Sequence, residues 1–333
     1  MFEQDVPLAP LTTLGIGGPA KFFTRAESVD DVREALAFAE ARALPLLVLA
    51  GGSNVLIPDE GFDGLVVHVD LRGITIESED ADSVIVNVGA GERWDDFVDF
   101  AVASGWAGIE CLSGIPGSAG ATPIQNVGAY GQDVSETIIR VEVLERATGR
   151  VVDLTNAECG FAYRSSIFKN AAKDRYVVIS VTFRLRPGAP ASLRYPELRA
   201  ALDGIDDLGA VREAVIAIRR RKGMVLDPQD PDTRSDGSFF MNPIVPPERV
   251  PEGAPQFPSV EGVKLSAAWL IERAGFHKGF VHGRVGISTK HTLALVNRGG
   301  GTAAEVRELA AMIQAGVRET FGVELQPEPV FVR

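Results

Sequence analysis

The stretch PGSAGATPIQNVGAYG, residues 116–131, is the part of the sequence that most restricts the fold. It holds four glycines and three alanines and no charged side chain, although 23% of the whole chain is charged. The uncharged run extends from Cys111 to Gln132, and it is too rich in glycine and proline to form a helix or a membrane span. We interpret it as an ordered loop whose backbone lies against a ligand, with a purely structural loop as the alternative.

A second glycine-rich loop, AGGSN at 50–54, follows the aliphatic run LPLLVLA at 44–50, which predicts a buried strand. Residues without bulky side chains let backbone N–H groups reach phosphate oxygens, and Ser53 and Asn54 add short side-chain donors. Neither loop matches the G-x-G-x-x-G or G-x-x-x-x-G-K-[ST] motif, so the sequence supports neither a Rossmann nor a P-loop assignment. Taken alone, this loop is equally an ordinary turn after a strand.

Composition and charge narrow the class of protein. A chain of 333 residues with 45% hydrophobic content has the length of two or three folded domains. The formal charge of −12 leaves no general basic surface, so extended contact with nucleic acid is disfavoured and small ligands are favoured as partners. We expect no obligate protein partner.

Cysteine and histidine usage argues against a disulfide framework and against a metal site. Cys111 and Cys159 are the only cysteines, and a reduced compartment suits them. The acidic N-terminal segment MFEQDVPLAP lacks a signal pattern, and no aliphatic run is long enough to cross a bilayer, so we expect a cytoplasmic protein without membrane contact. We predict no metal, since credible ligand spacing is missing around the histidines, which are His68, His277, His282 and His291.

The hydrophobic patterns predict a mixed helix and strand fold. Predicted strands lie at 44–50, 64–70, 83–89, 141–154, 176–185 and 292–297, and predicted helices at 29–43, 94–104, 206–222, 266–275 and 303–322. The Pro/Asp-rich run LDPQDPDTRSDG at 226–237 is expected to be a linker or a mobile loop that leads into a second domain.

Three polar residues outside the glycine loops are candidates for chemistry. Arg164 in YRSS is a partly buried cation that needs an anionic partner, Ser238 in GSFFMNP lies between glycine and phenylalanine, and Glu328 in LQPEP lies between prolines. Each also has an ordinary structural explanation, respectively an ion pair, a capped turn and a solvated carboxylate. The run RRRK at 219–222 complements a helix C-terminus in the same way.

Taken together, five motifs in this order resemble the UDP-N-acetylenolpyruvoylglucosamine reductases, flavoenzymes of peptidoglycan precursor synthesis. The motifs are LAGGSNVLI (49–57), IPGSAGATPIQNVGAYG (115–131), YRSSIFK (163–169), DGSFFMNP (236–243) and QPEPVF (326–331). The resemblance implies an α+β fold with a vanillyl-alcohol-oxidase-type FAD-binding region in two subdomains and a smaller α+β substrate-binding domain. The expected boundaries are 1–70, 71–205 and 206–322, with 323–333 returning to the active site.

The resemblance also implies noncovalent FAD, NADPH as reductant, and reduction of the enolpyruvyl ether of UDP-N-acetylglucosamine to UDP-N-acetylmuramate. That product serves cell wall biogenesis, cell shape and cell division. The implied catalytic residues are Arg164, Ser238 and Glu328. The implied FAD contacts are Gly51, Gly52, Ser53, Asn54, Ile115, Gly117, Gly120, Gln125, Asn126 and Gly128. The implied substrate contacts are Tyr130, Tyr195, Arg219, Lys222, Asn242, Lys278 and His291.

Two positions depart from the family pattern, which often has a basic residue where Met241 stands and can have a glutamine where His291 stands. Tyr195 matches a mobile tyrosine that closes over the uridine nucleotide in one branch of the family. One alternative is another FAD-dependent oxidoreductase of the same superfamily that acts on a sugar or an alcohol. The 116–131 loop, however, has no histidine for covalent flavin attachment. A non-catalytic nucleotide-sugar binder is the second alternative, against which the intact Arg164, Ser238 and Glu328 argue.

Overall fold

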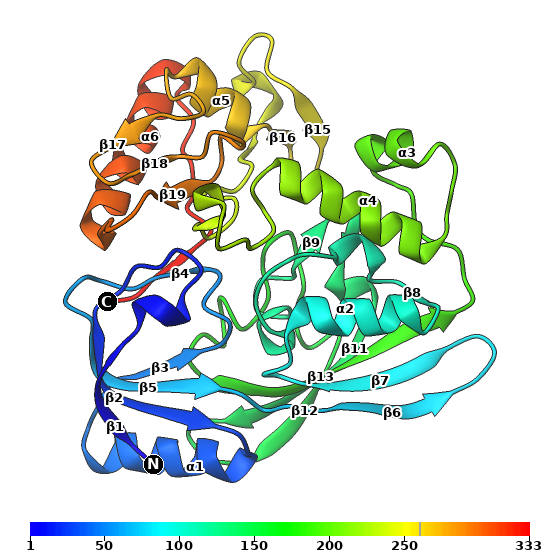
Figure 1. Ribbon diagram of the computed structural model, residues 1–333, viewed down its shortest axis with the longest axis vertical. Helices are drawn as coiled ribbons and strands as arrows, with labels where there is room; N and C mark the ends of the chain where they lie inside the picture. Colours follow the sequence, from blue (N-terminus) through cyan, green and yellow to red (C-terminus); the bar gives the residue numbers. More distant parts are fainter. Residues whose placement is uncertain (260) are drawn as a thin grey trace. The chain divides into compact units, whose positions relative to one another are not determined.

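The computed structural model describes residues 1–259 and 261–333, which form two compact units (Figure 1). Unit 1 consists of Met1–Val6, Lys21–Gly51 and Asp63–Arg220, and unit 2 of Pro7–Ala20, Gly52–Phe62 and Arg221–Arg333. Two short N-terminal segments therefore belong with the C-terminal part of the chain. The expected boundaries at 70, 205 and 322 divide the chain differently from these two units, and they stay a prediction.

A four-stranded sheet forms the N-terminal part of unit 1. Its order is β1 (Glu3–Pro7), β2 (Pro19–Ala26), β5 (Phe62–Val69) and β3 (Leu46–Leu49), and β3 runs parallel to β5. Helix α1 (Val29–Ala41) begins at Ser28, whose hydroxyl accepts from Asp31 N in a capping box. Its apolar side packs on this sheet, as the periodicity at 29–43 predicted.

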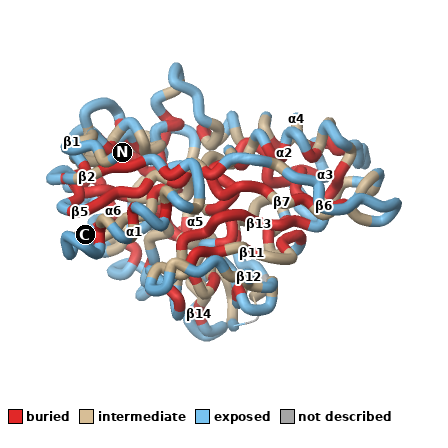
Figure 2. Tube along the Cα trace, turned by 90° about the horizontal axis from the view of Figure 1, so that it is seen from below, coloured by how far each residue is buried: buried red, intermediate tan, exposed pale blue. Residues whose placement is uncertain are grey.

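A larger antiparallel sheet completes unit 1. Its order is β12 (Val151–Thr155), β11 (Ile138–Glu145), β13 (Tyr176–Pro187), β7 (Val84–Gly89) and β6 (Ile74–Glu79), and β8 (Trp106–Ala107) pairs with the end of β13. The run predicted as strand at 141–154 is a hairpin, because the turn at 146–150 interrupts it. Burial follows β7 and β13, whereas β6 at the sheet edge is largely exposed (Figure 2).

One helix packs on this sheet, and two further helices of unit 1 form a core of their own. Helix α2 (Trp94–Ala103) buries Trp94 and Phe97 against Phe183 of β13, with ring centroids 5.7 and 5.1 Å from that ring. Helices α3 (Pro196–Leu202) and α4 (Leu208–Arg221) form a separate small core with Cys111, and the α4 residues in it are the predicted Val211, Val215 and Ile218. Short elements between the strands are η2 (Glu110–Leu112), η3 (Ala119–Ala121), β9 (Gly128–Ala129), β10 (Gln132–Asp133) and η4 (Val134–Glu136).

Unit 2 has one long helix against short strands. Helix α6 (Ala303–Phe321) ends at Gly322, which has φ +67° as its C-cap, in agreement with the predicted stop. The other elements are η1 (Ala9–Leu11), β4 (Val55–Leu56), η5 (Pro231–Thr233), β14 (Ile244–Val245), η6 (Pro247–Arg249), β15 (Gln256–Pro258), β16 (Val263–Leu265), α5 (Ala267–Arg273), β17 (Val281–His282), β18 (Val285–Ile287), β19 (Leu295–Asn297) and β20 (Val330–Phe331). Strand β20 pairs in parallel with β4.

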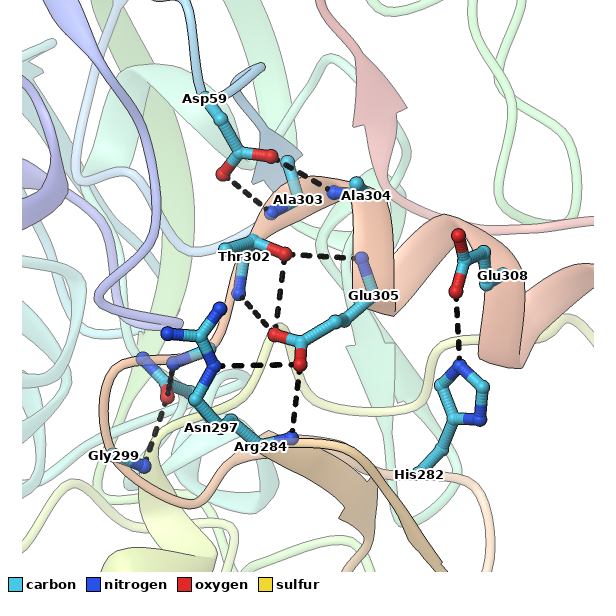
Figure 3. Close-up of polar contacts among 11 residues, drawn as sticks. Asp59, His282, Arg284, Asn297, Gly299, Thr302, Ala303, Ala304, Glu305 and Glu308 are labelled. Carbon is cyan, nitrogen blue, oxygen red and sulfur yellow. Dashed lines mark hydrogen bonds and ion pairs between the residues drawn. The ribbon is translucent and has the colours of Figure 1, made fainter.

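The start of α6 shows why residues 52–62 belong to unit 2. Asp59 accepts from Ala303 N at 2.7 Å and from Ala304 N at 3.0 Å, and the Thr302 hydroxyl accepts from Glu305 N at 3.2 Å (Figure 3). These bonds satisfy three N–H groups that an isolated helix leaves open. The 12–16 segment is also hydrogen-bonded to the C-terminal part of unit 2, because Asn297 Nδ2 donates to the carbonyl oxygen of Leu14 at 3.1 Å.

The 226–237 run lies within unit 2 and does not join the two units, which corrects the expectation of a linker, while a mobile loop stays a prediction. Asp232, Thr233, Ser235 and Asp236 are buried. Asp232 accepts from Thr289 N at 3.2 Å, and the Thr233 hydroxyl donates to the Asp227 carbonyl at 2.9 Å. Asp232 and Thr233 are thus hydrogen-bonded within the fold, which composition alone does not reveal. Over the described residues, no helix combines the length and the apolar character that crossing a membrane requires.

Candidate functional site

The two glycine-rich loops touch each other backbone to backbone in unit 1. A Cβ added to Gly51 would lie 2.6 Å from Gly117 Cα and 3.1 Å from Ser118 N, closer than a side chain tolerates. Gly117 also has φ +113°, a conformation that other residues rarely adopt. The sequence suggested that these glycines let a ligand approach the backbone. In the structure, the absence of side chains lets the two loops approach each other.

The first half of the 116–131 loop is held by backbone hydrogen bonds to the segment between β7 and α2 and to the first residue of α2. Gly120 N donates to Ala90 O at 2.9 Å, Ala119 N to Glu92 O at 2.8 Å, and Trp94 N to Gly117 O at 3.0 Å. A Cβ on Gly120 would lie 2.5 Å from Ala90 Cβ, so glycine is required there by packing.

Ser118 is a candidate that the sequence reasoning missed. Its side chain is 5% exposed, and its hydroxyl has no hydrogen-bond partner among the residues that the structure describes. A buried hydroxyl without a partner is costly unless a ligand completes it. Its position between Gly117 and Gly120, which are both implied FAD contacts, is the feature of the sequence that could have identified it. This orphaned donor, beside two backbone loops free of bulky side chains, fits a polar cofactor.

The loop begins at Gly114, whose peptide group is held from both sides. Its N–H donates to Asp95 Oδ1 at 2.6 Å, and its carbonyl accepts from Arg219 Nε at 3.2 Å. Arg212 binds Asp95 at 2.7 Å. Burial favours a higher pKa for Asp95, but the hydrogen bonds from Arg212 and Gly114 outweigh it and hold the pKa below its usual value. Burial lowers the pKa of Arg219, opposed by Tyr130 and Asp95.

Three predicted substrate residues lie together in unit 1. The rings of Tyr130 and Tyr195 are perpendicular, with centroids 5.3 Å apart, and the side chain of Tyr130 hydrogen-bonds Arg219. Tyr195 is the residue before α3 and is 37% exposed. A Cβ on Gly131 would lie 2.9 Å from Arg194 Cβ, so the 128–131 and 194–195 loops are in contact.

Arg164 lies over the second half of the glycine-rich loop. Its guanidinium donates to Gly128 O at 2.6 Å and to Asn126 O at 3.4 Å, and it lies 4.0 Å from the Asp133 carboxylate. Arg164 and Asn126 have φ of +53° and +48°, an uncommon conformation that costs energy and recurs at functional sites.

Asn126 holds the loop in place through its side chain. Its Nδ2 donates to Ala162 O at 3.1 Å, and its Oδ1 accepts from Ser135 N at 3.1 Å. One N–H of this side chain and its oxygen thus serve the fold of the loop. Ile115 and Gln125 are half-buried in the same loop.

Ser238 and Glu328 are brought together in unit 2, although they are far apart in the sequence. Phe239 O accepts from Glu328 N at 2.8 Å, and Met241 N donates to Gln326 O at 3.0 Å, so 237–242 and 326–328 run side by side. Phe239 and Phe240 are buried and fix the first segment. Ser238 is half-buried, and its hydroxyl makes no bond to the described part of the chain, which leaves it available to a ligand.

The predicted phosphate loop joins the same cluster in unit 2. Asn54 Nδ2 donates to Glu328 O at 3.3 Å, and Val330 N donates to Asn54 O at 3.0 Å. Gly52 has φ +60°, and an added Cβ would lie 1.9 Å from Leu11 O, so only glycine fits. Ser53 is half-buried beside it.

The remaining predicted substrate residues of unit 2 are more dispersed. Asn242 Oδ1 accepts from Ala267 N at 2.9 Å at the start of α5, so that atom serves the fold. Lys278 is exposed, Lys222 is half-buried, and His291 is held through its backbone at Ser288 and Ala294. No group of three potential metal ligands occurs within residues 1–259 and 261–333.

Comparison with known proteins gives two matching family models. Residues 228–332 match the C-terminal domain of UDP-N-acetylenolpyruvoylglucosamine reductase, and residues 20–155 match an FAD binding domain. The chain is 51% identical to the UDP-N-acetylenolpyruvoylglucosamine reductase of Thermobifida fusca over 99% of this chain and 98% of that one, and 50% identical to that of Streptomyces coelicolor over 99% and 90%. The solved reductase from Thermus caldophilus has a TM-score of 0.69 at 25% identity, over 100% of this chain and 98% of that one.

Proposed function

This chain belongs to the UDP-N-acetylenolpyruvoylglucosamine reductase family, and on that basis we propose that it reduces the enolpyruvyl ether of UDP-N-acetylglucosamine to UDP-N-acetylmuramate for peptidoglycan synthesis. It is an FAD-dependent oxidoreductase with an α+β fold. The observation that carries the assignment of chemistry to residues is the hydrogen bond from Glu328 N to Phe239 O, since it places Ser238 and Glu328 on adjacent segments.

We propose that FAD binds noncovalently to the glycine-rich loops, with NADPH as the reductant. Contacts by Gly51, Gly117 and Gly120 are proposed from the family resemblance of the two loops, because the missing side chains at Gly51 and Gly120 are already required by packing within the protein. The buried Ser118 hydroxyl is an additional donor for the cofactor. The 116–131 loop contains neither histidine nor cysteine for a covalent flavin bond.

Bound FAD would supply the hydride-transfer chemistry between NADPH and the enolpyruvyl double bond. The residues of this chain stabilise the negative charge that develops on the substrate and donate the proton that completes the product. Hydride addition at the terminal carbon builds negative charge on the adjacent carbon and its carboxylate, and a fixed cation stabilises it. We assign the cation to Arg164, polarisation of the site to Glu328, and the proton that completes the ether to Ser238.

The uridine nucleotide is proposed to lie against Tyr195, Tyr130 and Arg219, with its phosphates bound by Lys222 and Lys278. The perpendicular tyrosine rings and the Tyr130–Arg219 hydrogen bond support the first group. Asn242 and His291 complete the proposed contacts, and Asn242 offers its amide nitrogen, because its oxygen is bonded to Ala267. NADPH and the sugar nucleotide must reach the same reactive atom, so they bind one after the other.

A cytoplasmic location and roles in cell shape and division are part of the same proposal. Cys111 and Cys159 are buried and unpaired with each other, which suits a reducing compartment.

The decisive experiment measures NADPH oxidation with the enolpyruvyl substrate, using Ser238→Ala protein as the matched control. Turnover in the parent protein, and turnover slower by roughly 10²–10⁴ in the control, would support the assignment. Oxidation of a sugar or alcohol with oxygen, together with flavin that stays with acid-precipitated protein, would favour another oxidoreductase of the superfamily. Nucleotide-sugar binding without turnover would leave a binding protein.

A further inference from the structure

Asp236, two residues before Ser238, is a buried carboxyl with almost no hydrogen-bond support. Its side chain is 6% exposed, and its Oδ2 atom has no partner in the described part of the chain. Oδ1 lies 3.4 Å from the Thr13 hydroxyl, but that hydroxyl has a closer acceptor in Ser235 O at 2.7 Å. Because a hydroxyl has one hydrogen, the carboxyl receives at most a weak bond.

No charge compensates this carboxyl either. Burial raises the pKa of Asp236 to about 8, and the Thr13 hydroxyl opposes the rise only in part. Its charged neighbours in the chain face elsewhere, since Asp232 accepts from Thr289, and Arg234 is exposed. At neutral pH the group is thus a carboxylic acid with an O–H to donate.

The position of this acid connects it with the predicted phosphate loop. Thr13, which contacts Asp236, donates its backbone N–H to Gly52 O at 2.9 Å. Gly52, Ser53 and Asn54 follow as the proposed pyrophosphate donors. Asp236 is joined to this loop through Thr13. An ionised carboxylate at that position would repel a pyrophosphate, whereas a neutral acid can donate a hydrogen bond to it, as protonated carboxyls in apolar sites do.

We propose that Asp236 is a cofactor-binding residue, whose neutral carboxyl donates a hydrogen bond from Oδ2 to a pyrophosphate oxygen of FAD. The identity of the ligand rests on the proposed function, while the need for an acceptor rests on the unpartnered, buried oxygen. Binding of FAD then requires the protonated acid, so the affinity falls at alkaline pH.

The test is titration of the apoprotein with FAD, followed by flavin fluorescence, from pH 6.5 to pH 9.5. For a group that titrates at about 8, the apparent Kd rises about tenfold by pH 9. Asp236→Asn keeps an N–H donor without an ionisable proton, so its Kd should match the parent at pH 7 and stay nearly constant to pH 9. Asp236→Ala, which lacks the donor, should bind roughly 10- to 100-fold more weakly at pH 7.

Asp232→Asn is the matched control, because Asp232 is equally buried in the same loop but is hydrogen-bonded to Thr289. It should retain the alkaline weakening of the parent. The proposal is overturned if Asp236→Asn weakens with pH as the parent does, or if correctly folded Asp236→Ala binds FAD as tightly as the parent. Failure of the parent to bind FAD at any pH would instead overturn the proposed function.

Discussion

Asp236, Ser118 and Asn126 show what single residues contribute that sequence reasoning could not reach. All three lie within the quoted motifs. The hydrogen bonds of Asp236 and Asn126, however, go to Thr13 and Ala162, which lie far away in the chain, and the Ser118 hydroxyl has no partner in the described part of the chain. Whether a polar side chain is satisfied by the fold or available to a ligand is a property of such long-range partners.

The first prediction concerns the stability cost of Asp236. The pKa of Asp236 is raised from 3.8 to about 8 in the folded protein. Its contribution to the free energy of unfolding is therefore fully present below pH 4 and is lost as the pH rises toward 8. The stability advantage of Asp236→Asn over the parent should therefore grow by about 1.4 kcal/mol per pH unit in that window, without FAD. Denaturant unfolding of both apoproteins at several pH values measures it. Parallel stability curves would show that the carboxyl is not buried as described.

The second prediction separates the half-reactions at Ser238. An alkyl hydroxyl protonates only a strongly basic carbanion or enolate, so its role is confined to the reaction with the enolpyruvyl substrate. Ser238→Ala should leave flavin reduction by NADPH nearly intact and slow flavin reoxidation by roughly 10²–10⁴. Stopped-flow absorbance follows each step. Ser238→Cys should lose less, since a thiol can donate. Equal slowing of both steps would indicate that Ser238 only shapes the pocket.

The third prediction tests Tyr195 as the residue that closes over the nucleotide. Removing its hydroxyl in Tyr195→Phe should weaken substrate binding by about 0.5–1.5 kcal/mol and leave the flavin potential unchanged. Tyr176→Phe on β13 is the matched control, because this ring packs against Phe168 away from the Tyr130 pair. Calorimetry with the sugar nucleotide gives both affinities, and equal affinities for the two variants would remove Tyr195 from the site.

At the scale of elements, helices with a local sequence pattern were predicted well, whereas the pairing of strands from distant parts of the chain was not predicted. Helix α6 was predicted from its apolar face and Gly322, because both signals lie within the helix. Strands β1 and β2 were missed, since β1 is almost wholly exposed and three of the four buried positions of β2 are Ala20, Thr24 and Ala26, which carry little hydrophobic signal. The parallel pairing of β4 with β20 has no local signal, because it joins two very short strands from distant parts of the chain.

The fourth prediction concerns the α6 N-terminus. Asp59→Ala leaves the Ala303 and Ala304 N–H groups without their carboxylate and should reduce the stability of unit 2 by roughly 0.5–2 kcal/mol. Asp63→Ala is the control, because its ion pair with Lys21 at 2.7 Å is exposed and should contribute little. Hydrogen exchange of the first α6 amides reports the local effect. Equal exchange in both variants would contradict the capping role.

For the whole molecule, the fifth prediction is that FAD stabilises the folded chain. A ligand that binds only the native state at 100 times its Kd adds about 2.7 kcal/mol. Denaturant midpoints measured with and without FAD test this, with AMP at the same concentration as a control for nucleotide effects. An unchanged midpoint with FAD would show that the glycine-rich loops do not bind it.

The pairing of β4 with β20 also sets the order of events during protein synthesis. Val330 follows Leu56 by 274 positions along the chain, so at roughly 5–20 residues per second the ribosome delivers the partner strand about 15–55 s later. In that interval, residues 52–62 have neither β20 nor the α6 amides that Asp59 binds. A ligand that needs Asn54 and Glu328 together is therefore loaded only after β20 has emerged.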